Sequence, residues 1–544
     1  MIKKRFQFIK KTVALLLSVS LVAGMCGCAK NDNNGSQSSQ PTLEAKVDPI
    51  DDNYRVMYEI FTGSFADSNG DGTGDLLGIM DKLDYLNDGN INSGESLGIQ
   101  GIWLTPIFSS PSYHKYDVQD YYSIDKDFGT ESDLQALLDE CHKRNVILIL
   151  DLVINHTSTQ NQWFKNFVEA HKNNDTEDPY YDFYTWAKKS EVPGGRTFNR
   201  IAGTMDEYYE CNFSSDMPEL NYDNETVRQE MLKVAKHYID LGVDGFRFDA
   251  IKYIYYGDTA KSVDFWNWYC KELKAYKNDI YMVGECWDSE GITLEYVKAV
   301  NCFNFQAGQP EGMIASGVKG YINTYTNYIE KYQDKVQTSD ADGMMINFLS
   351  NHDLDRAAGY MTVAGFKAQM AANLLILCSG SPFLYYGEEI GMRGTRGGSN
   401  TDANRRLAML WGDGNSIMDP VGTNYDSSKQ TQDTVEIQVE KEDSLFNHYR
   451  KVIEVRNRHP EIARGEYKAV STKESPVGGF EITYKDSSIL LLHNVDADEL
   501  TIDLSEIKGL TKEYSKITDF VGIGNATLDG TKLTIGGQTS VVIE

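Results

Sequence analysis

The chain has 544 residues, of which 41% are hydrophobic, 11% aromatic and 24% charged. This composition is typical of packed globular proteins and excludes collagenous, disulfide-scaffold and largely disordered chains, while the length indicates several domains. The chain has 52 Lys and Arg against 80 Asp and Glu, a formal charge of −28, which repels phosphate backbones, so we expect no nucleic-acid partner.

The N-terminus has the parts of a secretory signal. Positive residues at positions 3–11 precede the apolar stretch 13–23, which is too short for a membrane span of about 20 residues. Cys26-Gly27-Cys28 resembles the cleavage box of bacterial lipoproteins, and we expect Cys28 rather than Cys26 to be lipidated. Residues 1–27 are thus predicted to be a signal peptide and 28–50 a flexible linker. These features predict an extracellular protein anchored to a bacterial membrane by lipid.

From residue 54 onward, eight short apolar runs alternate with helical patterns. The runs lie at 55–61, 101–106, 146–154, 243–248, 280–285, 302–305, 344–349 and 382–386, with helical periodicity at 76–86, 131–144, 226–241 and 365–377. Continuous apolar runs are typical of strands buried on both faces of a parallel sheet. The pattern predicts an α/β fold, a (β/α)8 TIM barrel over 51–156 and 224–460, with reactive groups after the strands.

Two further domains are predicted. The segment between the third run and the helix near 226 is far longer than a βα loop, so 157–223 reads as an inserted domain B. Short alternating runs at 480–484, 488–494 and 500–504 predict a C-terminal antiparallel β-sandwich over 461–544. The cysteines beyond the signal lack C-x-x-C spacing, and we expect them to be free and buried.

Four segments place a carboxylate or a histidine where a predicted buried strand ends. They are Asp151-Leu-Val-Ile-Asn155-His156, Gly245-Phe-Arg247-Phe-Asp249-Ala250, Gly284-Glu285-Cys286 and Asn351-His352-Asp353. One such segment alone would indicate a salt bridge at the barrel rim, but four at one mouth favour a catalytic cleft. Clustered carboxylates suit acid/base chemistry on a neutral polyol, because burial and like charges push their pKa values apart.

In this order, the segments resemble the conserved regions of glycoside hydrolase family 13, the α-amylase family, and the resemblance covers residues 54–544. Supporting stretches begin at Tyr113, Met217 and Tyr385. The resemblance implies that Asp249 is the nucleophile, Glu285 the general acid/base and Asp353 the carboxylate that holds the distorted sugar. It also implies a set of substrate-binding residues: Tyr116, Asp151, His156, Arg247, Lys252 and His352.

The resemblance gives most of these residues distinct roles. Arg247 lies two residues before Asp249, on the same face of its strand, and would orient the nucleophile and keep it ionised. Asp151 would support Arg247, and Tyr116 would stack on the sugar at the cleavage site. The two histidines of the set would hydrogen-bond hydroxyls of that sugar.

Residues after the predicted nucleophile bear on specificity. In the family, the next residue tends to be Val in enzymes that cut α-1,6 bonds of short oligosaccharides, whereas here it is Ala250. Lys252 resembles the lysine with which α-amylases hold glucose units on the leaving side. These features favour a monomeric, retaining endo-hydrolase of α-1,4-glucosidic bonds in starch, glycogen and maltooligosaccharides. An α-glucosidase, an oligo-1,6-glucosidase or a neopullulanase-like enzyme stays open, as does an inactive glucan-binding surface protein.

The loop after the first predicted strand has the spacing of an EF-hand-type Ca²⁺ loop, with oxygen ligands at positions 1, 3, 5 and 9 and glycine at 6. The expected ligands are Asp67, Asn69, Asp71, Thr73 through its carbonyl, and Asp75. Position 12 is Gly78 rather than Glu, so the loop is not a true EF-hand. Family relatives carry a similar structural calcium loop, and a second calcium site at Asn155 stays open.

Overall fold

The computed structural model describes residues 47, 49–361, 367–398 and 401–544. The predicted signal peptide, the lipidation site Cys28 and most of the linker lie outside the described residues, so they remain predictions from the sequence. Over the part of the chain that is described, no helix has the length and apolarity needed to cross a membrane. The six described cysteines are free and buried, as predicted.

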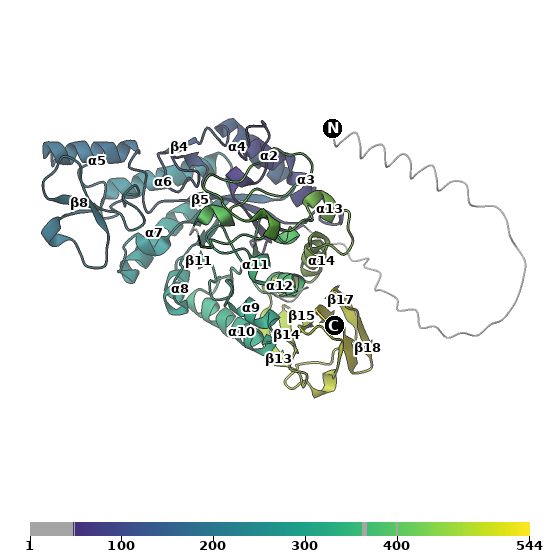
Figure 1. Ribbon diagram of the computed structural model, residues 1–544. Helices are drawn as coiled ribbons and strands as arrows, with labels where there is room; N and C mark the ends of the chain where they lie inside the picture. Colours follow the sequence, from purple (N-terminus) through teal and green to yellow (C-terminus); the bar gives the residue numbers. More distant parts are fainter. Residues whose placement is uncertain (1–46, 48, 362–366, 399–400) are drawn as a thin grey trace, which may run out of the picture. The chain divides into compact units, whose positions relative to one another are not determined.

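A curled parallel sheet of seven strands forms the centre of the fold (Figure 1). In spatial order the strands are β11 (Asn301–Cys302), β10 (Tyr281–Gly284), β9 (Gly245–Phe248), β5 (Ile147–Leu152), β2 (Gly101–Leu104), β1 (Met57–Ile60) and β12 (Phe383–Tyr385). The seventh predicted run, at 344–349, forms two single bridges instead of a regular strand. Ile346 pairs with Phe303 beyond β11, and Phe348 pairs with Phe383 in β12, so this run joins the two edges of the sheet. The arrangement is that of the predicted (β/α)8 fold.

Helices follow the strands along the chain. They are α2 (Leu76–Asp81), α3 (Leu83–Leu86), α4 (Glu131–Lys143), α6 (Glu225–Asp240), α7 (Thr259–Tyr276), α8 (Glu290–Val297), α9 (Met313–Val318), α10 (Ile322–Ser339), α11 (Ala357–Met361), α12 (Lys367–Ile376), α13 (Val435–Gln438), α14 (Leu445–Arg458) and α15 (Pro460–Arg464). The helix predicted at 76–86 is two helices, because Lys82 has the non-helical ψ of 4°. The first two residues of the helix predicted at 365–377 lie outside the described residues.

The strands alternate their side chains between two cores. Met57 of β1 and Trp103 of β2 lie in the barrel interior, whereas Tyr58, the next residue of β1, packs with the helices. Strand β9 approaches β10 so closely that a Cβ at Gly245 would lie 1.9 Å from the Tyr281 carbonyl oxygen. This contact requires glycine and fixes β9, which carries Arg247 and ends directly before Asp249.

Among the described residues, four antiparallel sheets lie outside the barrel, and one of them is the two-stranded pair of β3 (Phe108–Ser109) and β4 (Asp120–Ile124). Residues 157–223 contain α5 (Gln162–Asn173) and the sheet β6 (Trp186–Lys188), β8 (Glu207–Glu210) and β7 (Phe198–Arg200). The C-terminal part has two sheets. The first has the strand order β13 (Glu466–Ser471), β14 (Val477–Tyr484), β15 (Ser487–Asn494), β20 (Thr539–Ile543) and β17 (Ile517–Gly522). The second has the order β16 (Leu500–Asp503), β19 (Lys532–Ile535) and β18 (Ala526–Asp529). Strands β13 and β14 contact α10 (Figure 1). The C-terminal antiparallel sheets agree with the predicted fold, while the exact domain boundaries remain predictions.

Candidate active site

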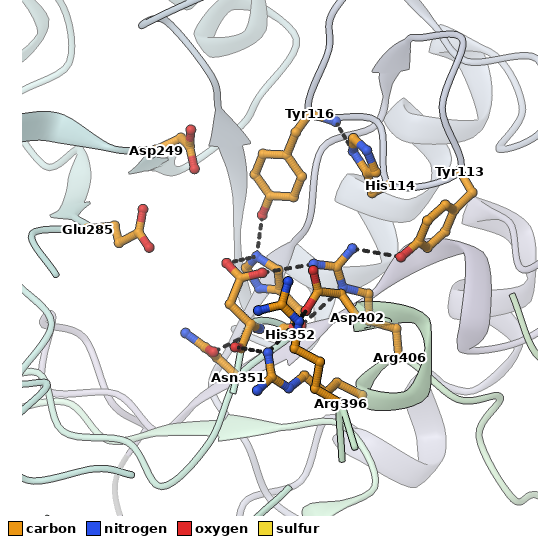
Figure 2. A network of polar contacts seen from close by, with 12 residues as sticks. Tyr113, His114, Tyr116, Asp249, Glu285, Asn351, His352, Arg396, Asp402 and Arg406 are labelled. Atoms are coloured by element: carbon orange, nitrogen blue, oxygen red, sulfur yellow. Dashed lines mark hydrogen bonds and ion pairs between the residues drawn. The ribbon is translucent and has the colours of Figure 1, made fainter. Parts of the chain in front are cut away.

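The parallel register of β9 and β10 brings two predicted catalytic residues to one level. Arg247 pairs with Val283 and Phe248 with Gly284, so Asp249 and Glu285 leave the sheet side by side. Both carboxyl groups lie at the C-terminal ends of their strands, where barrel enzymes place reactive groups. Figure 2 shows them facing the network that contains His352 and Arg406.

The buried guanidinium of Arg247 joins three carboxylates. Its Nη1 donates to Asp151 Oδ1 at 2.8 Å and to Asp249 Oδ1 at 2.7 Å. Its Nη2 lies 3.1 Å from Glu285 Oε2. Ala250 has a left-handed backbone, with φ of 49°, and its amide donates to Glu285 Oε2 at 3.0 Å. These bonds fix the two predicted catalytic carboxyls relative to each other.

Burial and neighbouring charges act on the pKa values of both carboxyls. Burial raises the pKa of Glu285, the charges of Asp249 and Asp353 raise it further, and Arg247 opposes them. Burial also raises the pKa of Asp249, against the attraction and hydrogen bond of Arg247. Because Arg247 lies closer to Asp249, the proton is better placed on Glu285. One ionised and one protonated carboxyl is the pair that glycoside hydrolysis requires.

Asp353 is held by two cationic side chains. Arg406 Nη2 donates to Asp353 Oδ1 at 2.8 Å, and His352 Nε2 lies 3.1 Å from Asp353 Oδ2. Burial opposes ionisation, but His352 and Arg406 outweigh it and hold the pKa of Asp353 well below its usual range. A carboxylate fixed in this way accepts hydrogen bonds from a ligand throughout the neutral pH range.

Tyr116 lies in the loop between β3 (Phe108–Ser109) and β4 (Asp120–Ile124). Its hydroxyl donates to Asp151 Oδ2 at 2.8 Å and lies 2.7 Å from His352 Nε2, as Figure 2 shows for the histidine. The rings of Tyr116 and His352 stack, with centroids 5.4 Å apart. The structure thus brings Tyr116, Asp151 and His352 into one network with the predicted catalytic residues.

His156 is buried at the end of the segment that follows β5. Burial lowers its pKa to about 4, so the imidazole is neutral at pH 7. Its Nδ1 lies 3.3 Å from Asn155 Nδ2, and its Nε2 has no hydrogen-bond partner among the described residues. A neutral ring nitrogen without a partner is available to a ligand hydroxyl, the contact that the sequence predicts.

Lys252 does not join the carboxylate network. Its Nζ donates to the Trp287 carbonyl at 2.7 Å and to Asp288 Oδ2 at 3.0 Å. Trp287 itself is 43% exposed and stacks on Phe305, with centroids 5.1 Å apart. Lys252 therefore lies beside an exposed aromatic side chain, and its predicted contact with glucose units remains a prediction.

Two members of the network, Glu59 and Arg406, were not predicted from the sequence. Glu59 lies inside the buried run of β1, and its Oε1 is 2.6 Å from His352 Nδ1. A buried carboxylate is destabilising unless it is paired. The acidic residue within this apolar run was therefore a signal in the sequence for a buried ionic partner. Arg406 lies in the long loop after β12, and its local sequence carries no comparable signal.

The predicted calcium loop is well ordered by hydrogen bonds to its own backbone. Asp67 Oδ1 accepts from the amides of Asn69 and Gly70, and Asp75 Oδ1 accepts from the Gly78 amide. The oxygen donors are of the kind that Ca²⁺ prefers. Within the described ranges, however, no three His, Cys, Asp or Glu side chains form a group that could hold a metal ion. Calcium binding at this loop remains a prediction.

Comparisons with known proteins agree with this geometry. Residues 59–465 match the family described as "Alpha amylase, catalytic domain". Alpha-amylase 3 of Dictyoglomus thermophilum is 34% identical over 495 residues, which cover 90% of this chain and 93% of that protein. The oligo-1,6-glucosidase of Bacillus cereus is 29% identical over 528 residues, covering 83% and 92%. The solved structure of Eubacterium rectale Amy13B superposes with a TM-score of 0.84 and 36% identity, covering 92% and 96%. The chain therefore belongs to the α-amylase family of glycoside hydrolases.

Proposed function

We propose that this enzyme is a retaining endo-hydrolase of α-1,4-glucosidic bonds in starch, glycogen and maltooligosaccharides. The observation that carries the proposal is the single Arg247 guanidinium, which contacts Asp249 at 2.7 Å and Glu285 at 3.1 Å. Two carboxyls that share one guanidinium are compatible with the short separation of about 5–5.5 Å that retaining glycosidases use. An inverting enzyme needs a wider gap to admit water between them.

In the proposed reaction, Glu285 gives its proton to the glycosidic oxygen while ionised Asp249 attacks the anomeric carbon. The bond to the leaving sugar breaks, and a covalent glycosyl–enzyme forms on Asp249. Glu285, now ionised, takes a proton from water, whose oxygen attacks the anomeric carbon and releases Asp249. Asp353 accepts hydrogen bonds from hydroxyls of the distorted sugar, and His156 Nε2, which has no partner among the described residues, offers another contact.

Asp249→Asn and Glu285→Gln should each lower kcat on starch by about 1000-fold or more, because each removes one carboxyl function without changing volume. A maltooligosaccharide with an activated aryl leaving group, supplied with azide, should restore turnover to Glu285→Gln and not to Asp249→Asn. This substrate needs no general acid, and azide needs no general base. Unchanged melting curves would serve as the folding control. More than about a tenth of wild-type activity in either variant would contradict these roles.

The preference for α-1,4 bonds is supported by the small side chain next to the nucleophile. Ala250 is buried, and its amide donates a hydrogen bond to Glu285. Its methyl group leaves more space for the departing sugar than the valine common in relatives that cut α-1,6 bonds. The similarity to an α-amylase over 90% of the chain points the same way. The similarity to an oligo-1,6-glucosidase over 83% of the chain keeps that activity as the second candidate.

The two candidates give opposite substrate profiles. We expect rapid internal cleavage of amylose, seen as a fall in viscosity before glucose appears, and little activity on isomaltose. Ala250→Val should lower kcat/KM on maltoheptaose by about tenfold, since added bulk of one or two methylenes is worth roughly 1–3 kcal/mol. A higher kcat/KM on isomaltose, or glucose release at constant viscosity, would favour the exo-acting glucosidase instead.

We further infer that the loop at 67–75 binds Ca²⁺ and braces the long loop after β12. Ser416 Oγ donates to Asp67 Oδ2 at 2.6 Å, and the Met418 amide donates to the Gly72 carbonyl at 2.9 Å. Arg406, which holds Asp353, belongs to the same long loop. Ligands that bind only the folded state stabilise it, so a bound ion would stabilise both loops together.

Removal of calcium should therefore lower thermal stability more than it lowers activity in the cold. We expect chelation to lower the Tm by about 3 °C or more, because saturating ligand contributes roughly 2–3 kcal/mol. Asp71→Asn, a change at an exposed loop position, should reduce the difference in Tm between calcium and chelator. The same Tm for the wild type with and without chelator would indicate an ordinary turn.

We also propose that Cys28 carries a lipid that anchors the enzyme to the outer face of a bacterial membrane. The support is the sequence of the signal and its cysteine box. Cys28→Ser should release the enzyme from the membrane fraction of an expressing cell, whereas the matched variant Cys26→Ser should stay bound. Equal membrane association of both variants would contradict lipidation at Cys28.

A further inference from the structure

A buried chain of polar contacts runs from β1 to the site. Glu59 Oε1 lies 2.6 Å from His352 Nδ1 and accepts from the His352 amide at 3.3 Å. The two side chains are 2% and 0% exposed. Glu59 is thus shielded from solvent and faces the side of the imidazole opposite to Asp353. Its side-chain hydrogen bonds link it to the site through His352.

The hydrogen bonds around His352 determine how many protons the ring carries. The Tyr116 hydroxyl has one proton, and it donates that proton to Asp151 Oδ2 at 2.8 Å. Burial raises the pKa of Asp151 to about 7, against the charge of Arg247. Because both oxygens of Asp151 accept from Arg247, at 2.8 and 3.0 Å, neither is positioned to carry a proton, and we assign Asp151 as the ionised acceptor. The Tyr116 oxygen, 2.7 Å from His352 Nε2, must then accept a proton from that nitrogen. Nδ1 faces the Glu59 carboxylate and carries a proton as well, so the ring is an imidazolium.

The charged and titratable groups that face this ring come from several elements. They are Glu59 of β1, Tyr116 of the β3–β4 loop, Asp353 of the ring's own segment and, one contact away, Asp151 of β5, Arg247 of β9 and Arg406 of the loop after β12. Trp103 of β2 meets the ring edge-on at 5.8 Å. Burial disfavours the charged ring, but Asp353 and Glu59 outweigh it and raise the pKa of His352 to about 10.

We propose that Glu59 is a positioning residue that keeps His352 doubly protonated, with Nε2–H directed at Tyr116 and Asp353. The proposal deepens the proposed function, because it concerns how Asp353 is held ready for the sugar. With a neutral residue at position 59, one of the two carboxylates that stabilise the charged ring is gone, so His352 loses its proton at a lower pH than in the wild type. Asp353 then faces an uncharged ring and keeps its hydrogen bond from Arg406. Sugar distortion at the site weakens in the same pH range.

The test compares pH profiles of kcat/KM on maltoheptaose for the wild type, Glu59→Gln and the matched control Glu389→Gln. Glu389 is equally buried and accepts from the hydroxyls of Tyr58 and Tyr85, away from His352. We expect Glu59→Gln to stay within about threefold of wild type at pH 5 and to lose activity at least one pH unit earlier on the alkaline side. The Glu389→Gln profile should keep the wild-type shape.

The acidic side of the profile separates this effect from a general one. Removing one negative charge would by itself shift the acidic and alkaline sides together, because it acts on Asp249 and Glu285 alike. A loss confined to the alkaline side therefore reports His352. Equal loss at all pH values, equal shifts of both sides, or an unchanged profile in Glu59→Gln would each overturn the proposal.

A direct measurement keeps the inference testable if Glu59→Gln does not fold. In the wild-type enzyme with ¹⁵N-labelled histidine, both ring nitrogens of His352 should carry protons at pH 8, and the signal should vanish in His352→Gln. Loss of one proton with a midpoint near pH 6.5 would overturn the proposal. Because this readout needs no substrate, it tests the doubly protonated state of His352, on which the role of Glu59 depends, even if the enzyme fails to cut α-1,4-glucans.

Discussion

A single buried guanidinium organises the active site. Arg247 is 1% exposed, and a charge at that depth is tolerated only when neighbouring charges and hydrogen bonds compensate for lost hydration. Three carboxylates do so, from β5, from the end of β9 and from the end of β10. The same contacts that stabilise the cation also set the spacing of Asp249 and Glu285. Fold and chemistry are therefore coupled here, because neither carboxyl can move without leaving the arginine poorly paired.

The third carboxylate is held in a different way. Asp353 faces two cations, Arg406 and His352, whereas Asp249 and Glu285 share one. The cluster as a whole can therefore keep one proton on Glu285 while Asp353 stays ionised. Like charges that are crowded together without such uneven compensation would protonate in a less defined order. The uneven distribution of cations, more than the number of acids, gives each carboxyl its own task.

Contacts between residues at strand ends could be predicted from the sequence, and contacts that depend on tertiary closure could not. Asp249 and Glu285 follow continuous buried runs, so their placement at one barrel mouth follows from strand order alone. Glu59 and His352 are 293 residues apart, and they meet because β1 lies between β2 and β12 when the sheet curls. Residues 344–349 were predicted as a strand from their apolar pattern, but their backbone makes only single bridges to each neighbour.

Local sequence patterns do not predict the conformation of the long loop after β12, which is determined by its tertiary contacts. Arg406 reaches Asp353 only because this loop is attached to the segments after β1. The Met409 amide donates to the Ser64 carbonyl at 2.8 Å, and the Trp411 indole donates to the Phe65 carbonyl. Further along, Ser416 bonds Asp67 of the predicted calcium loop. The segments that begin at β1 therefore support both cationic partners of Asp353. Glu59 of β1 contacts His352 directly, and the residues after β1 hold the loop that carries Arg406.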